Sequence, residues 1–555
     1  MTKNLLKDQW LIVKKQQNDK ADKNLLVELV QIGDPNIEDI YAPRADFRGA
    51  LYQLLIGLLQ TTFAPQDRKY WLKYWKSPPT TAELEKAFMP YLDAFNLDSP
   101  IGKPAFMQDL MLTEGVESPV SSLFIEAPGG NTLKLNQDLF VKRGGIEQVS
   151  SYWAALALFT LQINAPSGGQ GHRVSLRGGG PLTSLLMPSG ESEFNTLWHK
   201  LWLNILTQDE MASLAGNESL SETKYIFPWM GATRISKNNG SETYPEHAHP
   251  LQAYWSMPRR IRLNWLQEEG ICNVSGEPTN TLVKTCYSQN YGTNYAGSWI
   301  HPLTPYVFET GKEPYSIKAQ PGGLGYRHWL ELAVANKEGK KTRSSAFIVE
   351  KYRESRYQWL KQAYRKEGIQ LTLEPRLWVF GYDMDNMKAR CWYETVMPVF
   401  NLDDAQRDDV QEIAKLMINA ATDVLSTLKS ALKIAWFRDP KHDPAAKKFT
   451  EKAIVLDSNF WSMTEPYFYQ LLSHQVSVLK QTNSTAKKQY LMDWGRYLRT
   501  TAFTLFEQYA ISSANADGDY QRIIKARDGK GGLEHYLNTS QALKRLVDKE
   551  ERVNG

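Results

Sequence analysis

The sequence predicts an α+β protein: a large mixed α/β N-terminal globular domain over residues 1–400, followed by a C-terminal four-helix bundle over residues 401–555. Length is the first observation, because 555 residues usually fill more than one hydrophobic core. The second is that short apolar runs alternate with clusters of glycine, proline and asparagine before residue 400. The third is that apolar residues recur at helical spacing after residue 400.

In the N-terminal part, three short segments predict strands and turns: DQWLIV, LFIEAPGGN and RLWVFGYDMDN. Two apolar stretches, Phe47 to Thr62 and Val149 to Ile163, predict helices. The segment Phe380 to Trp392 predicts a β-hairpin, because apolar residues flank a polar stretch. We expect the tip of this hairpin to be long, from Asp383 to Lys388.

The C-terminal part predicts four helices. The first carries a single apolar stripe formed by Val410, Ile413, Met417, Ala421, Leu425, Leu428 and Leu432. Three further helical stretches follow, at Pro466 to Lys480, at Ala486 to Ile511 and near Gly532 to Val547. Glycine and proline breaks separate the helices, and short connections between four helices favour an antiparallel bundle.

The formal net charge is +4, from 65 basic and 61 acidic residues. Proteins that bind nucleic acid mainly through charge are far more basic, so we expect any nucleic-acid contact to be local or shared with other subunits. The three cysteines, Cys272, Cys286 and Cys391, form no disulfide framework, which favours a reducing compartment. The first residues lack an apolar signal core, and the longest apolar stretch is too short to span a bilayer. We therefore expect a cytoplasmic protein with no membrane partner.

The densest glycine segment is APSGGQGHRVSLRGGGP, from Ala165 to Pro181. Its glycines allow the backbone to approach another backbone or a base edge closely. The segment is not a P-loop, because no Lys-Ser or Lys-Thr pair follows the glycines, and its spacing does not match a dinucleotide-binding fingerprint. A purely structural loop is the alternative interpretation.

A second segment, GNTLKLNQDLFVKRGG at residues 130–145, places Phe140 beside Lys142 and Arg143. An exposed aromatic ring next to basic residues is suited to stacking on a base while the charges hold phosphate. The alternative is a surface loop whose aromatic ring folds back onto the core.

The tip of the predicted hairpin combines an amide in Asn386, an apolar side chain in Met387 and a positive charge in Lys388. These groups are suited to contacting base edges and to separating a duplex step. Asp383 and Asp385 could instead form a metal-binding pair, but no further acidic or histidine ligand stands nearby in the sequence.

Nuclease chemistry requires metal ligands or a general base, so the histidines are candidates. His247 and His249 lie in PEHAHP beside Glu246, and His301 lies in SWIHPLTPY. The flanking prolines exclude the helix on which a zincin motif places its ligands. Cys272 and Cys286 lack the paired cysteines of a zinc knuckle.

We therefore expect no catalytic residue, no bound metal and no cofactor. The first alternative is a stand-alone metal-dependent nuclease that uses the three histidines with Asp383 and Asp385. The second alternative is an architectural helical adaptor in which the glycine segment is only structural.

Five segments together resemble the CasA family, the large subunit of the type I-E CRISPR Cascade surveillance complex. They are NLLKDQWLIV, the glycine segment with the following LTSL, PEHAHPLQAYWSMPRRIRL, GTNYAGSWIHPLTPY and GYDMDNMKARCWYE. The matches run in order from residue 4 to beyond residue 390, and helical sequence follows them as it does in the family.

The resemblance implies a non-catalytic subunit that recognises a short PAM in duplex DNA, mainly from the minor groove. It implies that the subunit wedges the duplex open for crRNA pairing and helps to recruit a helicase-nuclease. The implied partners are the other Cascade protein subunits, the crRNA, double-stranded target DNA and that helicase-nuclease. Sequence reading would be delegated to base pairing, as in other RNA-guided effectors.

The resemblance also implies roles for individual residues. The glycine loop that contacts the PAM corresponds to Ser167, Gly168, Gly169, Gln170 and Gly171. The wedge corresponds to Asp385, Asn386 and Met387 with Lys388, where Asn386 replaces the glutamine of the best-known members. The loop that faces the crRNA handle runs from Asn131 to Phe140 and includes Leu139. Spacing places the family's lysine finger at Asn290, with Lys284 nearby.

Overall fold

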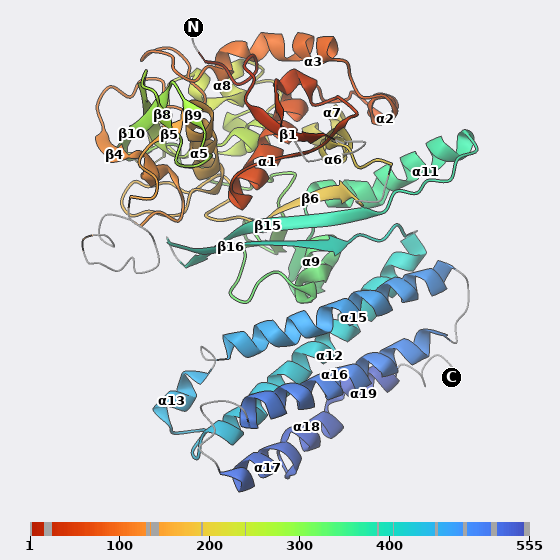
Figure 1. Cartoon of the computed structure of the whole chain (residues 1–555). Helices are drawn as coiled ribbons and strands as arrows, with labels where there is room; N and C mark the ends of the chain where they lie inside the picture. Colours follow the sequence, from red (N-terminus) through yellow and green to blue (C-terminus); the bar gives the residue numbers. More distant parts are fainter. Residues whose placement is uncertain are drawn as a thin grey trace. The chain divides into compact units, whose positions relative to one another are not determined.

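The computed structural model describes the chain except for residues 1–2, 16–24, 129–133, 135–143, 190–192, 239, 386–387, 403, 450–452, 481–485, 512–518 and 549–555. The chain forms two compact units (Figure 1). The first unit comprises Met1–Ala319 and Ala335–Val396, and the second comprises Gln320–Val334 and Met397–Gly555. The predicted fold class, a mixed α and β protein with a C-terminal helical region, is confirmed.

Two apolar helices form the centre of the first unit. Helix α1 (Ala45–Thr62) is buried on nearly all sides, as is α5 (Ser151–Asn164), because both helices are apolar around most of their circumference. They pack against each other, and the rings of Phe47 and Trp153 stack with centroids 6.0 Å apart. Both helices confirm the sequence prediction. Among the described residues of this unit, the other α-helices are α2 (Arg68–Lys76), α3 (Thr81–Phe88), α6 (Leu197–Trp202), α7 (Gln208–Ala212), α8 (Thr223–Ile226), α10 (Phe347–Lys351) and α11 (Tyr357–Lys366).

Short antiparallel sheets surround these helices. The sheet that supports the candidate site contains β4 (Val116–Pro119), β5 (Val149–Ser150), β7 (Arg260–Leu266) and β10 (Leu282–Gln289), with β10 paired to the other three. A second sheet combines β1 (Leu11–Lys15), β2 (Leu25–Val27) and β3 (Ile37–Ile40). A third combines β11 (Tyr306–Glu309), β12 (Tyr315–Ser316), β13 (Ala335–Glu338) and β14 (Lys341–Ser344). Strands β8 (Gly270–Ile271) and β9 (Pro278–Thr279) form a further pair.

The segment LFIEAPGGN was expected to form a strand, and this prediction is wrong for its described residues. The chain there forms a 3-10 helix at Val120–Leu123 and then a turn. Local hydrogen bonds explain the difference, because the backbone N–H groups of Phe124 and Ala127 donate to carbonyls three residues earlier.

The predicted β-hairpin is present as two long strands, β15 (Pro375–Asp385) and β16 (Lys388–Pro398), with β6 (Thr183–Pro188) on the other side of β15 (Figure 1). The expectation of a long tip from Asp383 to Lys388 is wrong. The strands extend to Asp385 and from Lys388, so the polar residues of the sequence motif lie mostly within the sheet.

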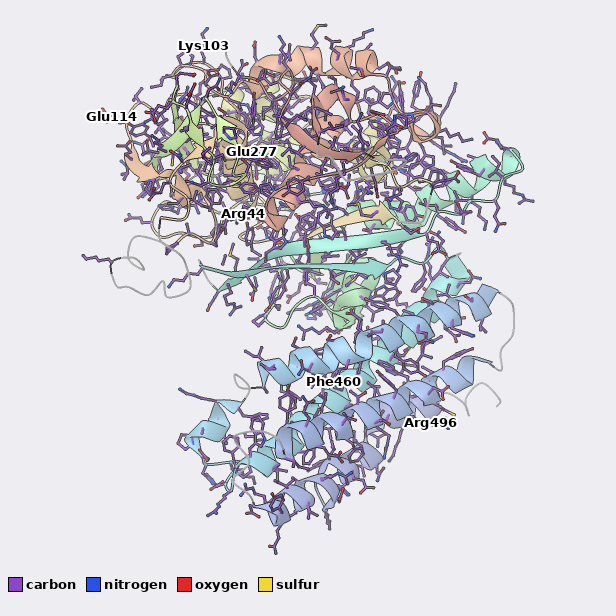
Figure 2. The ribbon with its side chains drawn as sticks, viewed as in Figure 1. Arg44, Lys103, Glu114, Glu277, Phe460 and Arg496 are labelled. Carbon is purple, nitrogen blue, oxygen red and sulfur yellow. The ribbon has the colours of Figure 1, made fainter. Side chains whose placement is uncertain are left out.

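In the second unit, three long helices pack alongside one another (Figure 1): α12 (Asp404–Trp436), α15 (Ile454–Lys480) and α16 (Ala486–Ile511). The predicted stripe is buried along α12 except at Ile413, which is half-buried. Phe460 on α15 (Figure 2) is fully buried. Three short helices pack along α12 in the place of the expected fourth helix: α17 (Tyr520–Asp528), α18 (Leu533–Thr539) and α19 (Gln541–Asp548). A short helix, α13 (Pro444–Lys447), precedes α15.

The sequence placed the second helical stretch at Pro466 to Lys480. The helix instead begins at Ile454 and contains Pro466. Among the described residues, we find no helix that is both long enough and apolar enough to cross a bilayer.

The segment Gln320–Val334, which includes α9 (Trp329–Ala333), belongs to the second unit although it lies far before residue 400. The Tyr326 ring stacks on Phe468 at a centroid distance of 4.3 Å, and its hydroxyl hydrogen-bonds to Thr464 at 3.0 Å. Trp329 donates from Nε1 to the carbonyl of Pro398 at 2.9 Å. Burial of these aromatic side chains explains why the segment packs with the C-terminal helices.

Candidate nucleic-acid interface

The glycine loop, Ser167–Gly171, follows the end of α5 and is exposed from Ser167 to Gln170. Gly169 has a φ of 94°, in the left-handed region that favours glycine, and no atom lies within 4 Å of the position of a Cβ there. The crest of the loop at Gly169 is therefore bare backbone that another molecule can approach.

The segment after β10 holds this loop in place. Asn290 donates from Nδ2 to the carbonyl of Gln170 at 3.0 Å, and the backbone N–H of Tyr291 donates to the carbonyl of Gly171 at 2.8 Å. A Cβ at Gly171 would lie 2.8 Å from the Cβ of Asn290, and its φ is 76°, so only glycine fits at this position. The structure thus places Asn290, the position that spacing matches to the family's lysine finger, against the glycine loop.

Lys284, the other candidate for a lysine finger, does not lie at the loop. It lies within β10, six residues before Asn290, and forms an ion pair of 2.5 Å with Glu268. A different lysine, Lys318, is exposed beside Gly178, after the glycine loop in the same glycine-rich segment, and its ammonium lies 3.7 Å from the position of a Cβ there. An isolated antiparallel bridge between Pro181 and Lys318 brings it there, and this long-range pairing has no local signal in the sequence.

Two arginines, Arg177 and Arg259, anchor the glycine-rich segment by donating hydrogen bonds to uncharged oxygen atoms. Arg177 is fully buried and donates to Gln53, Thr183, Thr304 and the carbonyl of Ile163. Arg259 donates from Nη2 to the carbonyl of Pro166, at the start of the loop. Burial lowers the pKa of each guanidinium to about 10. Both groups are still charged at neutral pH, and neither has a carboxylate partner within the described part of the chain.

The hairpin carries an ion pair close to its tip. Asp383 is 2% exposed and accepts two hydrogen bonds from Arg390, at 2.7 Å from Nη2 and 3.1 Å from Nε. Asp385 lies within 3.7 Å of Nη1 of the same arginine. The hydrogen bonds to Asp383 raise the pKa of Arg390. Because both carboxylates face the positive charge of Arg390, the pair is unsuited to holding a metal ion.

Several predicted residues cannot be placed. Asn386 and Met387 of the wedge lie outside the described residues, whereas Lys388 is exposed at the start of β16. Asn131, Leu139 and Phe140 of the expected crRNA-handle loop also lie outside the described residues.

The histidines of the nuclease alternative each serve a local backbone contact. The Nδ1 atoms of His247, His249 and His301 accept hydrogen bonds from the backbone N–H of Tyr244, Leu251 and Leu303. His301 is fully buried, and burial lowers its pKa well below the ordinary value. Across the described ranges, no group of three or more His, Cys, Asp or Glu residues is placed to hold a metal ion.

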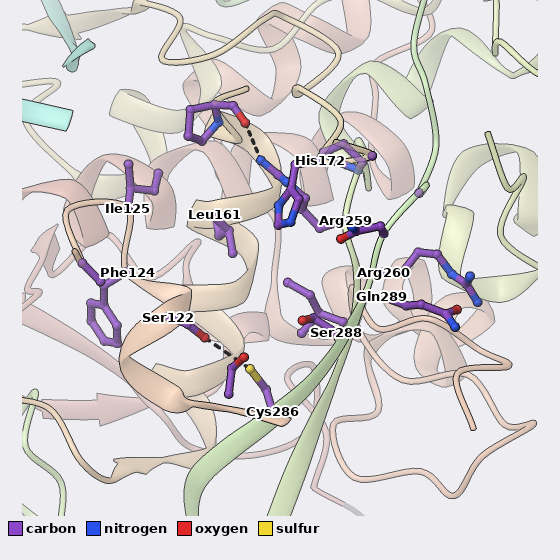
Figure 3. Close-up of a pocket in the computed structure, with 18 residues that line it drawn as sticks. Ser122, Phe124, Ile125, Leu161, His172, Arg259, Arg260, Cys286, Ser288 and Gln289 are labelled. Atoms are coloured by element: carbon purple, nitrogen blue, oxygen red, sulfur yellow. Dashed lines mark hydrogen bonds between the residues drawn. The ribbon is translucent and has the colours of Figure 1, made fainter. Parts of the chain in front are cut away.

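A pocket of about 260 Å³ lies beside the glycine loop (Figure 3). Its walls come from the region between Ser118 and Ala127, from Leu161 on α5, from Gly171 of the glycine loop with His172, and from the facing ends of β7 and β10. Ser122 and Cys286 contact each other at 3.6 Å on one wall. The pocket therefore lies directly beside the candidate PAM loop.

Comparison with known proteins places this geometry in a family. The family model for CRISPR-associated protein Cse1 matches residues 4–505. CasA of Thermus thermophilus is similar with a TM-score of 0.64 at 17% identity, and the alignment covers 99% of this chain and 100% of that chain. Cse1 from Acidimicrobium ferrooxidans gives 0.65 at 14% identity, with 99% of each chain covered. A chain of a CRISPR RNA-guided surveillance complex gives 0.58 at 15% identity, with 99% of each chain covered. These likenesses establish the fold.

Proposed function

The chain belongs to the CRISPR-associated Cse1 family, and from this we propose that it is the large, non-catalytic subunit of a cytoplasmic type I-E Cascade complex. In this role it recognises a PAM in duplex DNA from the minor groove and wedges the adjacent duplex open for crRNA pairing. It then helps to recruit the helicase-nuclease. The similarity to a chain of a CRISPR RNA-guided surveillance complex supports crRNA and the other Cascade subunits as partners.

The exposed crest of the glycine loop is the observation that carries this proposal. At Gly169 the backbone is unobstructed, while Asn290 and Tyr291 fix the loop from behind. A rigid backbone edge without side chains can enter the narrow minor groove and form hydrogen bonds with base edges. Because the minor groove presents a degenerate pattern, we expect the subunit to tolerate several PAM sequences.

The hairpin supports the second half of the proposal. Its strands extend to Asp385 and from Lys388, and the Asp383–Arg390 ion pair braces them close to the tip. Separating a base step costs a few kcal/mol, so a wedge must be held rigidly to do it. A braced two-stranded arm meets that requirement.

The substitution Gly169→Asp tests the role of the loop. A carboxylate at the crest would face DNA phosphates, so we expect PAM-dependent binding by the assembled crRNA complex to weaken by at least tenfold, on the order of 1–2 kcal/mol. Binding is measured with labelled duplexes that carry or lack a PAM.

Gly276→Asp is the matched control. Gly276 also has a positive φ, 74°, and open space at its Cβ position, but it lies in a turn remote from the glycine segment in sequence. The two variants therefore share the backbone strain and the added charge. Equal losses of binding in the two variants would count against the glycine loop as the PAM reader.

A further inference from the structure

The pocket beside the glycine loop is unusual in its charge. The 18 lining residues that the structure describes include Arg259, Arg260 and His172 but no aspartate or glutamate. Arg260 is neutralised elsewhere, because its Nε donates to Asp109 at 2.6 Å. Arg259 is not neutralised, so the pocket carries a net positive charge.

The guanidinium of Arg259 also has unused donors. Its Nη2 donates to the carbonyl of Pro166, whereas Nε and Nη1 are buried and have no hydrogen-bond partner among the described residues (Figure 3). Buried N–H groups without acceptors destabilise a fold, and a buried charge without a counter-ion does so more strongly. An anion that enters the pocket would relieve both costs.

The remaining polar groups of the pocket are suited to an oxyanion. Ser122, Ser288, Gln289 and Asn290 line it with hydroxyl and amide groups that can donate hydrogen bonds. Arginine is the side chain that most often holds phosphate, because its planar donor set matches the phosphate oxygens.

His172 connects this pocket to the crest of the glycine loop. A Cβ at Gly168 would lie 2.8 Å from the Cβ of His172, and partial burial and then the charge of Arg259 lower the pKa of the His172 imidazole. The pocket and the bare backbone at Gly169 are therefore adjacent parts of one surface.

We propose that this pocket is a phosphate subsite that takes one backbone phosphate of the duplex DNA whose PAM the glycine loop reads. The inference rests on the proposed function for the identity of the DNA, and on the pocket itself for the chemistry. The phosphate fixes the register of the duplex against the loop and carries no sequence information. Its counter-ion role explains why Arg259 is buried without a carboxylate.

A methylphosphonate scan tests the subsite. The crRNA-assembled complex is titrated with PAM duplexes in which one phosphate at a time is replaced by a neutral methylphosphonate. We expect one position beside the PAM to weaken wild-type binding about tenfold, and the same replacement to have no further effect on Arg259→Gln. We also expect Arg259→Gln to lower the slope of log affinity against log salt by about one.

A second variant guards against misfolding, because Arg259→Gln also removes the contact with Pro166. Gln289→Glu is nearly isosteric, lies at an exposed position and supplies the missing carboxylate within the pocket. It should abolish the same phosphate dependence. Gln267→Glu is the control: this residue is exposed near the other end of the β7–β10 pair, and it should behave as wild type.

Inorganic phosphate provides a second test of the subsite that does not depend on DNA. At constant ionic strength, sodium phosphate should raise the unfolding temperature of the free wild-type chain but not that of Gln289→Glu. Stabilisation by phosphate without any position-specific methylphosphonate effect would overturn the DNA assignment and leave a free-anion site. A lack of both effects would overturn the subsite.

The two proposals fail in different ways. A wild-type complex that binds PAM and non-PAM duplexes equally would reject PAM reading, whatever phosphate does to the free chain. The subsite alone would be rejected if PAM dependence stays intact and each methylphosphonate weakens binding by the Arg259→Gln complex as much as binding by the wild-type complex. If the phosphate effect depends instead on crRNA and persists without target DNA, the pocket serves the RNA and the DNA assignment is wrong.

Discussion

His199 is a largely buried histidine whose two ring nitrogens both have partners. Its Nε2 lies 3.1 Å from the carbonyl of Trp75, and its Nδ1 lies 2.7 Å from the hydroxyl of Thr196. This pairing suits the neutral ring, which donates from Nε2 and accepts at Nδ1. Burial lowers the pKa of His199 to about 4, and burial also lowers the pKa of His301 well below its ordinary value.

These shifts predict a loss of stability in mild acid. Below about pH 6.5 the unfolded chain binds protons that the folded chain excludes, so the free energy of unfolding falls as the pH falls. The contribution of His199 is complete above about pH 6.5 and is lost between about pH 6.5 and pH 4, by up to about 1.4 kcal/mol per pH unit.

Urea unfolding at about pH 7 and about pH 5 checks this prediction. We expect His199→Gln to lose less stability than wild type over this interval, because the variant has no proton to take up in the unfolded state. His442→Gln is the control, since His442 is exposed beside Asp439. Parallel pH profiles for wild type and His199→Gln would show that His199 is not the titrating group.

At the candidate site, sequence predicted some residues and missed others. Spacing before a recognisable motif singled out Asn290 as the position of the family's lysine finger, and its contact with the glycine loop emerged only from the structure. Lys318 and Arg259 were missed, since their positions depend on a bridge to Pro181 and on a contact with Pro166. Such contacts join segments more than 90 residues apart, and local patterns do not encode them.

At the scale of elements, the β15–β16 hairpin shows what alternation of apolar and polar residues can predict. The existence of the hairpin follows from the apolar runs on both sides of a polar stretch. The length of its tip cannot be predicted from the same pattern. Asp383 is polar but lies buried within a strand, because Arg390 neutralises its charge there. A buried ion pair gives the same sequence signal as an exposed turn.

The ion pair gives a test of the hairpin that leaves its tip intact. Asp383→Asn removes the charge that binds Arg390, so we expect a loss of about 1–3 kcal/mol in stability and a looser arm. On a fully paired PAM target, opening should slow, as followed by the fluorescence of 2-aminopurine beside the PAM. On a target with mismatches beside the PAM, the variant should behave as wild type.

Two further variants complete that comparison. Asn386→Ala with Met387→Ala should give the same pattern, because an apolar side chain and an amide are what a wedge needs at an unstacked step. Glu338→Gln breaks an ion pair with Arg343 on the β13–β14 hairpin and should not affect opening. A double alanine variant that is equally slow on paired and mismatched targets would remove the hairpin from this role.

At the scale of the whole molecule, the change in sequence pattern near residue 400 located the helical region. It could not show that Gln320–Val334 packs with that region. Tyr326 and Trp329 look like ordinary core residues in the sequence, and which core they join depends on Phe468 and Pro398, which lie far along the chain.

This arrangement predicts the behaviour of a truncated chain. Ending the protein after Val396 leaves Tyr326 and Trp329 without the groups that bury them, so we expect aggregation. The same truncation with Tyr326→Ser and Trp329→Ser should be more soluble, as judged by size-exclusion chromatography. Equal solubility of the two truncated proteins would mean that these rings do not require the C-terminal helices.

The same segment also sets an order of events during synthesis. Tyr326 leaves the ribosome about 170 residues before Trp494, one of the rings against which it packs. At a rate of about 5–20 residues per second, the delay is roughly ten to thirty seconds. Until Trp461, Phe468 and Trp494 have all emerged, the Tyr326 ring lacks part of the cover that it has in the folded protein. We therefore expect this segment to be a site of aggregation in the nascent chain until the C-terminal helices have been made.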